Sequence, residues 1–335
     1  MSILPVILAA GQGTRMKSAL PKVLHPVLGK PMLLYILDEI SQVTPLRPVV
    51  VIGHGADKVR EAIAARADTV IQESQLGTGH AVQSAEVKAA GQADFVIVAY
   101  SDMPCLQAET IRKVCEAQFQ NEGGVFSMLT IIQEDSHGFG RIIRHADGTV
   151  AAIVEEAQAT PEQLEIKECN VGLYCFKSEW LWPALKRIKL SPKGEYYLTD
   201  LVELANEEKL PVKAVVLEDT EEALGVNNRV HLSEASAVIR KRINRQWMLD
   251  GVTMVDPETV FIEKSVKIGR DVTIYPNSWI AGETMIADGC QIGPGAWITD
   301  SSIGAESTVR QSSVQNAAIP SGSVIGPFAV ITGES

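Results

Sequence analysis

The sequence is poor in features that mark several large classes of protein. It has five cysteines, an odd number, and no two of them have the Cys-x-x-Cys spacing of a zinc or redox site. Secreted domains that are held by disulfides usually have an even and larger number. No uninterrupted apolar run approaches the ~20 residues that a membrane-spanning helix needs. The sequence therefore predicts a cytoplasmic protein with reduced thiols and no membrane span.

Basic charge is also scarce. The 335 residues include 30 Lys and Arg against 41 Asp and Glu, which gives a formal net charge of -11 at pH 7. An acidic chain is a poor general binder of nucleic acids and of anionic membranes. If its substrates are phosphates, positive charge must be concentrated in a few Arg and Lys side chains. We therefore expect small-molecule substrates and no nucleic-acid partner.

Up to about residue 225, short apolar runs alternate with helical patterns. The candidate strands are residues 6–10, 49–52, 95–99 and 124–130, and the clearest helical patterns are residues 32–41, 57–65 and 79–90. Strands that are separated by helices predict β-α-β units. We therefore predict an α/β domain over residues 1–228 with a Rossmann-like, mixed and mostly parallel sheet. Ligands of such sheets bind at the carboxyl ends of the strands.

A single long helix is predicted over residues 229–250. Its apolar residues recur at spacings of three and four: Leu232, Ala235, Ile239, Ile243 and Trp247. Asn228 is a suitable N-cap, and Gly251 can end the helix. Residues 229–251 are therefore expected to link two domains.

The remaining residues, 252–335, form a hexapeptide repeat. Isoleucine occupies every sixth position along one stretch: Ile262, Ile268, Ile274, Ile280, Ile286, Ile292 and Ile298. The phase slips by one residue at Ile303 and Val309 and resumes at Ile319. A period of six predicts a left-handed parallel β-helix, in which each unit is one flat side of a triangular coil. About four coils are expected, and the last one is incomplete because the pattern stops at Ser335.

A glycine-rich segment follows the first candidate strand. It reads Leu8-Ala-Ala-Gly-Gln-Gly-Thr-Arg-Met16, and Pro21-Lys22 comes soon after it. Glycines 11 and 13 let backbone N–H groups approach a phosphate chain closely. Arg15 adds a planar donor fork, and Lys22 adds a point charge. A lone Gly-x-Gly is usually a tight turn, but this combination predicts phosphate binding.

The same signature resembles that of the nucleotidyltransferases that activate sugar 1-phosphates. Further segments are similar to the bifunctional bacterial enzymes with N-acetylglucosamine-1-phosphate uridylyltransferase and glucosamine-1-phosphate acetyltransferase activities. These segments are Gln75-Leu-Gly-Thr-Gly-His-Ala81, Gly138-Phe-Gly-Arg-Ile142, Glu155, Glu168-Cys-Asn-Val-Gly172, Gly194-Glu-Tyr-Tyr-Leu-Thr-Asp200 and Gly225-Val-Asn-Asn228. The resemblance covers the whole chain, but only the first part of the acetyltransferase half.

The resemblance implies transfer of UMP from UTP to N-acetylglucosamine 1-phosphate. The products are UDP-N-acetylglucosamine, a precursor for peptidoglycan synthesis, and pyrophosphate. Arg15 and Lys22 match the residues that stabilise charge during the transfer. Asp102 and Asn227 match the ligands of a Mg²⁺ ion, a metal that takes few protein oxygens. No Ser, Cys or His nucleophile is expected, because transfer in this family is direct. A homotrimer formed through residues 252–335 is also implied.

The resemblance also assigns binding residues. Those that match nucleotide contacts are Leu8, Ala9, Ala10, Gly11, Gly13, Gln72, Gly77 and Thr78. Those that match substrate contacts on the sugar side are Tyr100, Ser101, Gly140, Glu155, Asn170 and Thr199. Gln72 matches the reader of uracil, because an amide can donate and accept hydrogen bonds at once.

Two features depart from the family pattern. Ser101 stands where glycine is usual, which adds a Cβ and a hydroxyl close to the ligand. Val330 stands where a basic residue is usual, and the later coils that carry the acetyltransferase residues are missing, so acetyl transfer is not expected. Two alternatives stay open: a related enzyme that joins UTP or dTTP to glucose 1-phosphate, and a non-catalytic regulatory homologue. The presence of every residue that matches catalysis and metal binding favours a nucleotidyltransferase.

Overall fold

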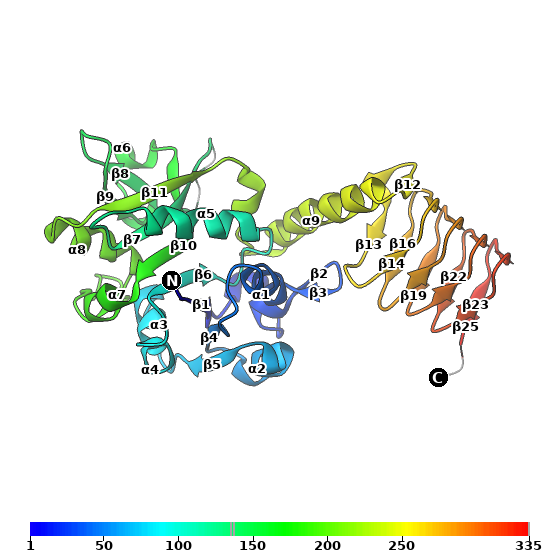
Figure 1. Ribbon diagram of the computed structural model, residues 1–335, viewed down its shortest axis with the longest axis horizontal. Coiled ribbons are helices and arrows are strands. Elements are labelled where there is room, and N and C mark those ends of the chain that lie inside the picture. The colour runs from blue at the N-terminus through cyan, green and yellow to red at the C-terminus, as the bar shows by residue number, and fades with distance from the viewer. Residues whose placement is uncertain (135, 137, 334–335) are drawn as a thin grey trace. The chain divides into compact units, whose positions relative to one another are not determined.

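A computed structural model describes residues 1–134, 136 and 138–333 (Figure 1). The chain divides into two compact units, one of Met1–His25 with Pro31–His231 and the other of Pro26–Lys30 with Leu232–Ser335. The first unit is of the α/β class and the second contains a parallel β-helix, so the predicted fold classes are confirmed. Within the described residues, no helix has both the length and the apolar content that crossing a bilayer requires.

A nine-stranded sheet forms the centre of the first unit. Seven of its strands lie in the order β11 (Val212–Leu217), β7 (Phe126–Ile132), β10 (Glu168–Lys177), β6 (Phe95–Tyr100), β1 (Ile3–Ala9), β4 (Val49–Ile52) and β5 (Asp68–Ile71). Of these seven described strands, β10 alone is antiparallel to its neighbours. The other two strands are β8 (Arg141–Arg144) and β9 (Val150–Val154). The sheet is therefore mixed and mostly parallel, as predicted.

Helices cover both faces of this sheet, which is why its central strands are continuous apolar runs. Successive side chains of β1 alternate between the faces. Val6 and Leu8 therefore pack into one core, while Ile7 packs into the other. The first core is covered by α3 (Thr78–Ser84), α4 (Glu86–Ala89), α7 (Ser178–Leu185) and α8 (Leu201–Glu207). The second is covered by α1 (Met32–Ser41), α2 (Ala56–Ile63) and α5 (Ala108–Phe119).

Some predicted boundaries differ from the observed ones. The helix predicted over 79–90 is divided, because the Ala85 N–H bonds to the Val82 oxygen and closes α3. The strand predicted over 124–130 is β7, which begins two residues later because residue 124 belongs to the turn after α5. Shorter elements are η1 (Thr14–Met16), η2 (Lys22–Leu24), β2 (Pro26–Val27), β3 (Lys30–Pro31), η3 (Ala64–Arg66), η4 (Glu156–Gln158), α6 (Pro161–Leu164), η5 (Leu198–Asp200) and η6 (Thr220–Ala223).

The predicted long helix is α9 (Arg229–Leu249). Its N-terminus is capped as expected, because Asn228 Oδ1 accepts hydrogen bonds from the N–H groups of Val230 (2.8 Å) and His231 (2.9 Å). The helix ends before Gly251, whose φ of 99° lies in the left-handed region that glycine tolerates. Both ends are therefore set by residues that the sequence pattern indicated.

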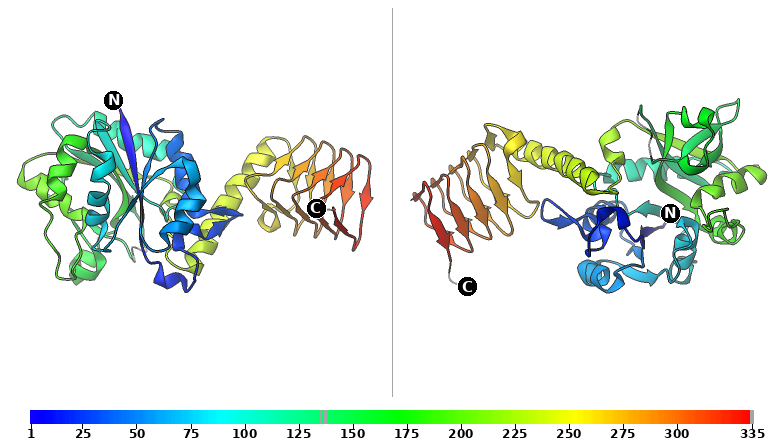
Figure 2. Two further views of the ribbon diagram at one scale, coloured as in Figure 1. Left: turned by 90° about the horizontal axis from the view of Figure 1, so that it is seen from below. Right: turned by 180° about the vertical axis from the view of Figure 1, so that it is seen from behind.

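Three parallel sheets form the β-helix, and its strands stack coil upon coil (Figure 2). The sheets have the orders β12-β15-β18-β21-β24, β13-β16-β19-β22-β25 and β14-β17-β20-β23. Their strands, with the short helix η7 (Pro257–Thr259), are β12 (Thr253–Met254), β13 (Phe261–Ile262), β14 (Lys267–Ile268), β15 (Thr273–Ile274), β16 (Trp279–Ala281), β17 (Met285–Ile286), β18 (Gln291–Ile292), β19 (Trp297–Thr299), β20 (Ser302–Ile303), β21 (Thr308–Val309), β22 (Ser313–Gln315), β23 (Ala318–Ile319), β24 (Val324–Ile325) and β25 (Val330–Thr332). Most of the repeating isoleucines are buried in the core of these coils, as the period of six predicted.

Shortened turns accommodate the phase slip without breaking the core. Ile286 pairs with Ile303 in the next coil. Ile298 pairs with Val314, which is fully buried although the predicted pattern omitted it. The strands keep their pairing because parallel hydrogen bonding depends on the register of the strands and not on the length of the turn between them.

Asn244 of α9 joins this helix to the start of the β-helix. Its Nδ2 donates to the carbonyl oxygens of Pro257 (2.8 Å) and Val260 (2.9 Å), and the residue is 1% exposed. Asn244→Leu leaves both carbonyls without this donor, so we expect the free energy of unfolding to fall by about 1–3 kcal/mol. Urea denaturation measures the loss. The control is Arg245→Ala, an exposed neighbour; an equal loss in both variants would contradict the assigned role of Asn244.

Candidate active site

The first unit contains a cavity of about 540 Å³ at the carboxyl ends of β1 and β6. Most of the predicted site residues line it: Leu8, Ala9, Ala10, Gly11, Arg15, Lys22, Gln72, Gly77, Thr78, Tyr100, Ser101, Asp102 and Glu155. Five other predicted residues do not line it: Gly13, Gly140, Asn170, Thr199 and Asn227. Gly13 and Asn227 lie beside Lys22, Gly140 and Thr199 lie beside Glu155, and Asn170 bonds to Gly140. The cavity therefore lies where an α/β sheet normally binds its ligand.

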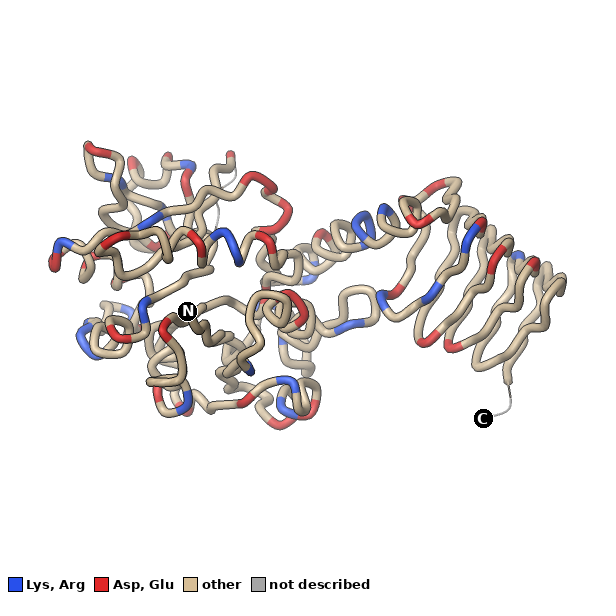
Figure 3. The backbone as a smooth tube through the Cα atoms, viewed as in Figure 1, with Lys and Arg blue, Asp and Glu red and all other residues tan. Residues whose placement is uncertain are grey.

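The loop after β1 places two cations on the cavity wall. A Cβ at Gly13 would lie 2.6 Å from Lys22 Cβ, and Gly13 has a φ of 62°, so this close approach requires glycine. Arg15 lies in η1, and Lys22 begins η2. Elsewhere most Lys and Arg are interspersed with Asp and Glu along the chain, although Arg240, Lys241 and Arg242 of α9 are consecutive (Figure 3). The glycine turn thus brings Arg15 and Lys22 to a single cavity.

These cations meet two side-chain oxygens from distant segments. Lys22 Nζ lies 2.5 Å from Asp102 Oδ2 and 3.2 Å from Asn227 Oδ1. Arg15 Nη2 donates to the same Asn227 oxygen at 2.9 Å. The Val226 N–H donates to the backbone oxygen of Asp102 at 2.8 Å, which holds the two segments side by side. The oxygens of Asp102 and Asn227 therefore both accept hydrogen bonds from the Lys22 ammonium group.

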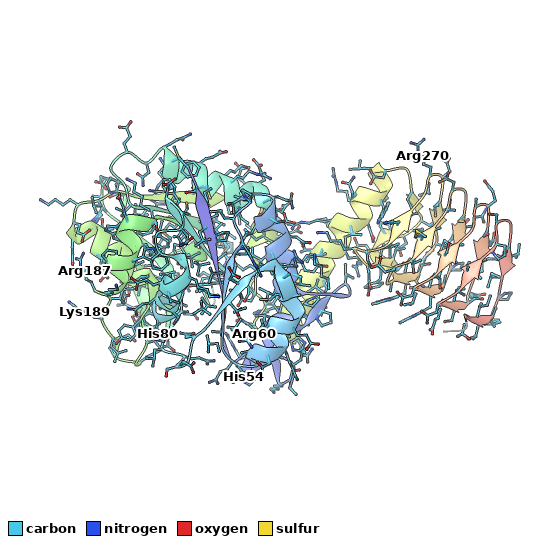
Figure 4. All side chains as sticks on the ribbon, turned by 60° about the horizontal axis from the view of Figure 1, so that its bottom comes forward. His54, Arg60, His80, Arg187, Lys189 and Arg270 are labelled. Carbon is cyan, nitrogen blue, oxygen red and sulfur yellow. The ribbon has the colours of Figure 1, made fainter. Side chains whose placement is uncertain are left out.

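Gln72, Gly77 and Thr78 form another part of the wall. Gln72 is 5% exposed, and its Nε2 donates to Gly77 O at 3.1 Å and lies 3.0 Å from Nδ1 of His80, which Figure 4 labels. A Cβ at Gly77 would lie 2.6 Å from Tyr196 O, so glycine is required there as well. The amide nitrogen of Gln72 already bonds within the protein. If both the oxygen and the nitrogen of this amide paired with uracil, the nitrogen would have to give up these internal bonds.

A further group of lining residues is acidic. Glu155 accepts a hydrogen bond from Thr199 Oγ1 at 3.1 Å. Burial raises the pKa of Glu155, and the nearby Glu195 adds to this rise. Burial also raises the pKa of Asp200, which lies close to Glu155 but does not line the cavity, to about 6, with contributions from Glu203 and Glu155. The cavity therefore combines a cationic wall, suited to phosphate, with carboxylate acceptors, suited to hydroxyl groups.

Ser101 is held by the neighbouring strand. Its Oγ donates to Leu8 O at 2.6 Å, and its backbone N–H donates to the same oxygen at 3.1 Å. The residue is 2% exposed. The hydroxyl that departs from the family pattern therefore ties β6 to β1, so its hydrogen is used within the protein.

Several lining residues were not among the predicted site residues: Val23, Gln75, Ala81, Glu195 and Tyr197. All but Val23 lie in segments that carry the family resemblance, and this was the available signal. Gln75 Nε2 donates to Ala10 O at 2.7 Å and so fixes the loop after β1. Across the described part of the chain there is no group of three or more His, Cys, Asp or Glu side chains that could hold a metal ion.

Comparison with known proteins agrees with this architecture. The family model of the MobA-like NTP transferase domain matches residues 5–165, and bacterial transferase hexapeptide repeats, six in number, match residues 265–300. The chain is 44% identical over 325 residues to the bifunctional protein GlmU of an Exiguobacterium species, covering 97% of the chain and 72% of that relative. It is 44% identical over 327 residues to the bifunctional protein GlmU of Halalkalibacterium halodurans, covering 97% and 72%. It is 41% identical over 325 residues to that of Enterococcus faecalis, covering 97% and 71%.

The matched segments include both the loop after β1 and the coils of the β-helix. A nucleotidyltransferase domain is thus followed by hexapeptide repeats, and the identity to these relatives extends over nearly the whole chain. The chain therefore belongs to the family of bifunctional GlmU proteins.

Proposed function

We propose that the chain transfers UMP from UTP to N-acetylglucosamine 1-phosphate and so produces UDP-N-acetylglucosamine and pyrophosphate. The observation that carries the proposal is the make-up of the cavity, in which Arg15 and Lys22 share one site with half-buried acceptors such as Glu155. The net charge of the chain is -11, so cations gathered in one cavity favour an anionic ligand. The proposed activity is nucleotidyl transfer alone, and its product would serve peptidoglycan synthesis.

In this reaction a phosphate oxygen of the sugar attacks the α-phosphorus of UTP. The bond from that phosphorus to the bridging oxygen of the β-phosphate breaks, and pyrophosphate leaves. The protein therefore has little covalent work to do and must position two anions and stabilise charge. Arg15 offers a planar fork of donors, and Lys22 offers a compact charge. We assign both residues to charge stabilisation, without a Ser, Cys or His nucleophile.

The oxygens of Asp102 and Asn227 fit a Mg²⁺ ion. Both contact the Lys22 ammonium group, so a cation already stands at the point on which they converge. Carboxylate and amide oxygens are the hard ligands that Mg²⁺ prefers, and it takes few of them from protein. We assign these two residues to hold the ion, which would neutralise charge on the phosphates.

The binding residues divide between the two substrates. We assign the nucleotide to Leu8, Ala9, Ala10, Gly11, Gly13, Gln72, Gly77 and Thr78, and the sugar phosphate to Tyr100, Ser101, Gly140, Glu155, Asn170 and Thr199. The glycines of the first group admit close backbone approach, which suits phosphates. The hydrogen bonds within the second group, such as Thr199 to Glu155 and Asn170 N–H to Gly140 O (2.8 Å), favour its acting as one surface.

Pyrophosphate release over a grid of nucleoside triphosphates and sugar 1-phosphates tests the proposal. We expect UTP with N-acetylglucosamine 1-phosphate to be among the best pairs. A preference for UTP or dTTP with glucose 1-phosphate would instead identify the related enzyme. Absence of release with every pair would favour a non-catalytic homologue.

Asp102→Asn should reduce turnover at limiting Mg²⁺ by more than about tenfold, equivalent to ~1.4 kcal/mol or more of barrier. The substitution removes the charged ligand and leaves the side-chain shape, so circular dichroism should show a folded protein. The control is Asp57→Asn on α2, whose side chain is 98% exposed. Turnover near the wild-type value for Asp102→Asn would refute the assigned metal role.

We also propose three functional regions: a nucleotidyltransferase region of residues 1–228, a linker helix of 229–251 and a β-helix of 252–335 that forms a homotrimer. Phe261, Trp279 and Trp297 stack in a row on the β-helix, with ring centroids 5.1 and 5.3 Å apart. Other side chains on it are apolar and exposed: Met285, Val324, Phe328 and Val330. Exposed apolar side chains on a solenoid favour burial against partners, and closed rotational symmetry is the general rule for oligomers.

Sedimentation equilibrium tests the assembly. We expect a single species at three times the monomer mass of 36.2 kDa. A species near the monomer mass at micromolar concentration would contradict the homotrimer, while the proposals for the cavity would be unaffected.

A further inference from the structure

Strand β10 contains a bulge next to the cavity. Its pairing with β7 shifts register between Asn170 and Tyr174. Gly172 lies within the bulge with a φ of 90°, and a Cβ there would sit 2.4 Å from Cε2 of Tyr100. Bulges re-aim side chains and are frequent beside functional sites. Here the bulge makes room for the ring of Tyr100, which lines the cavity.

The bulge also brings two side chains of one strand into contact. Asn170 Nδ2 donates to the Tyr174 hydroxyl oxygen at 2.7 Å, and the Gly172 N–H donates to Asn170 Oδ1 at 3.2 Å. Residues four apart in a regular strand are separated by ~13 Å along it, which makes such a bond difficult without a bulge. Both ends of the Asn170 amide are therefore held, one by Tyr174 and the other by the backbone.

The Tyr174 side chain also neighbours the cavity wall. Burial raises the pKa of Tyr174, and the nearby Tyr100, which lines the cavity, adds to this rise. The hydroxyl therefore stays protonated while it accepts the hydrogen bond from Asn170. Asn170 and a residue of the cavity wall are thus both neighbours of Tyr174.

Packing alone does not account for the hydroxyl. Tyr174 is 1% exposed, and its ring stacks on Phe176 at 5.5 Å and meets Phe126 edge to face at 6.5 Å. A phenylalanine at this position would fill the same aromatic cluster without burying a polar group. What the hydroxyl adds is its bond to Asn170.

We propose that Tyr174 is a positioning residue for sugar recognition, which orients the Asn170 amide through its buried hydroxyl. The inference rests on the proposed function, in which Asn170 belongs to the sugar-phosphate side of the site. Tyr174 does not line the cavity, so its effect is exerted through Asn170. Loss of the hydroxyl therefore weakens binding of the sugar phosphate more than binding of the nucleotide.

Tyr174→Phe in the full chain tests this role. We expect the KM for N-acetylglucosamine 1-phosphate to rise about tenfold, because the Asn170 amide loses the hydroxyl that holds it. The KM for UTP should change by less than about twofold, because the loop after β1 is untouched. The matched control is Ser127→Ala, which removes another buried hydroxyl: its Oγ donates to Val114 O at 2.6 Å on the other side of the sheet. This control should leave both KM values unchanged.

A double-mutant cycle separates positioning from a general loss of stability. If Tyr174 acts through Asn170, Tyr174→Phe should have a smaller effect on the KM in an Asn170→Ala background than in the wild type. Fully additive effects, an unchanged KM for the sugar phosphate, or equal increases for both substrates would overturn the proposal.

The side-chain amide of Asn170 provides a readout that does not depend on activity. In protein labelled isotopically at asparagine, the NMR signals of the Asn170 amide are assigned by their loss in Asn170→Ser. Tyr174→Phe should shift these signals, while Ser127→Ala should leave them in place. If the wild type releases no pyrophosphate with any pair of substrates, the proposed function fails, and these signals still decide whether Tyr174 holds Asn170. Unshifted signals in Tyr174→Phe would overturn the positioning role.

Discussion

Leu8 lies opposite Tyr100 where β1 and β6 pair in parallel, and the arrangement of the cavity depends on this register. The two strands end at the same edge of the sheet, so the glycine loop after one and the turn after the other must meet. Ser101 reinforces the junction, because its hydroxyl and its N–H both donate to the Leu8 oxygen. One further backbone bond, from Val226 to Asp102, then brings Asn227 to the same point.

Positive charge is concentrated at the cavity in this acidic chain. Lys22 is flexible by itself, but its ion pair with Asp102 fixes its ammonium group at a site where the two side chains are only 14% and 19% exposed. Asn227 contributes an oxygen without adding a second negative charge, and it accepts from Arg15 as well. Together these four side chains carry one net positive charge, which suits anions, although the chain as a whole is negative.

The β-helix is stabilised by a different kind of interaction. Each coil contacts mainly its neighbours, so the core consists of stacked equivalents such as Ile280 on Ile298. The same stacking operates outside the coil, where Trp279 lies between Phe261 and Trp297. A shortened turn does not disrupt the core, because the strands of successive coils remain in register. In the α/β unit, by contrast, strands far apart in the sequence must pair before either core can form.

Local patterns were sufficient to predict much of this protein. The period of six requires one inward side chain for each flat side of the coil. Asn228 and Gly251 mark the two ends of α9. The apolar runs indicate strands that are covered on both faces. The Gly-x-Gly loop with Arg15 and Lys22 indicated phosphate handling, and residue-level roles came from the family resemblance. Only the tertiary structure decided which side chains meet. Arg15 and Asn227 are separated by 212 positions, Ser101 turned out to bond β1, and the link from Asn170 to Tyr174 needs a bulge. Such contacts depend on the order and register of strands, because these bring remote segments within hydrogen-bonding distance, and no local pattern of residues specifies them.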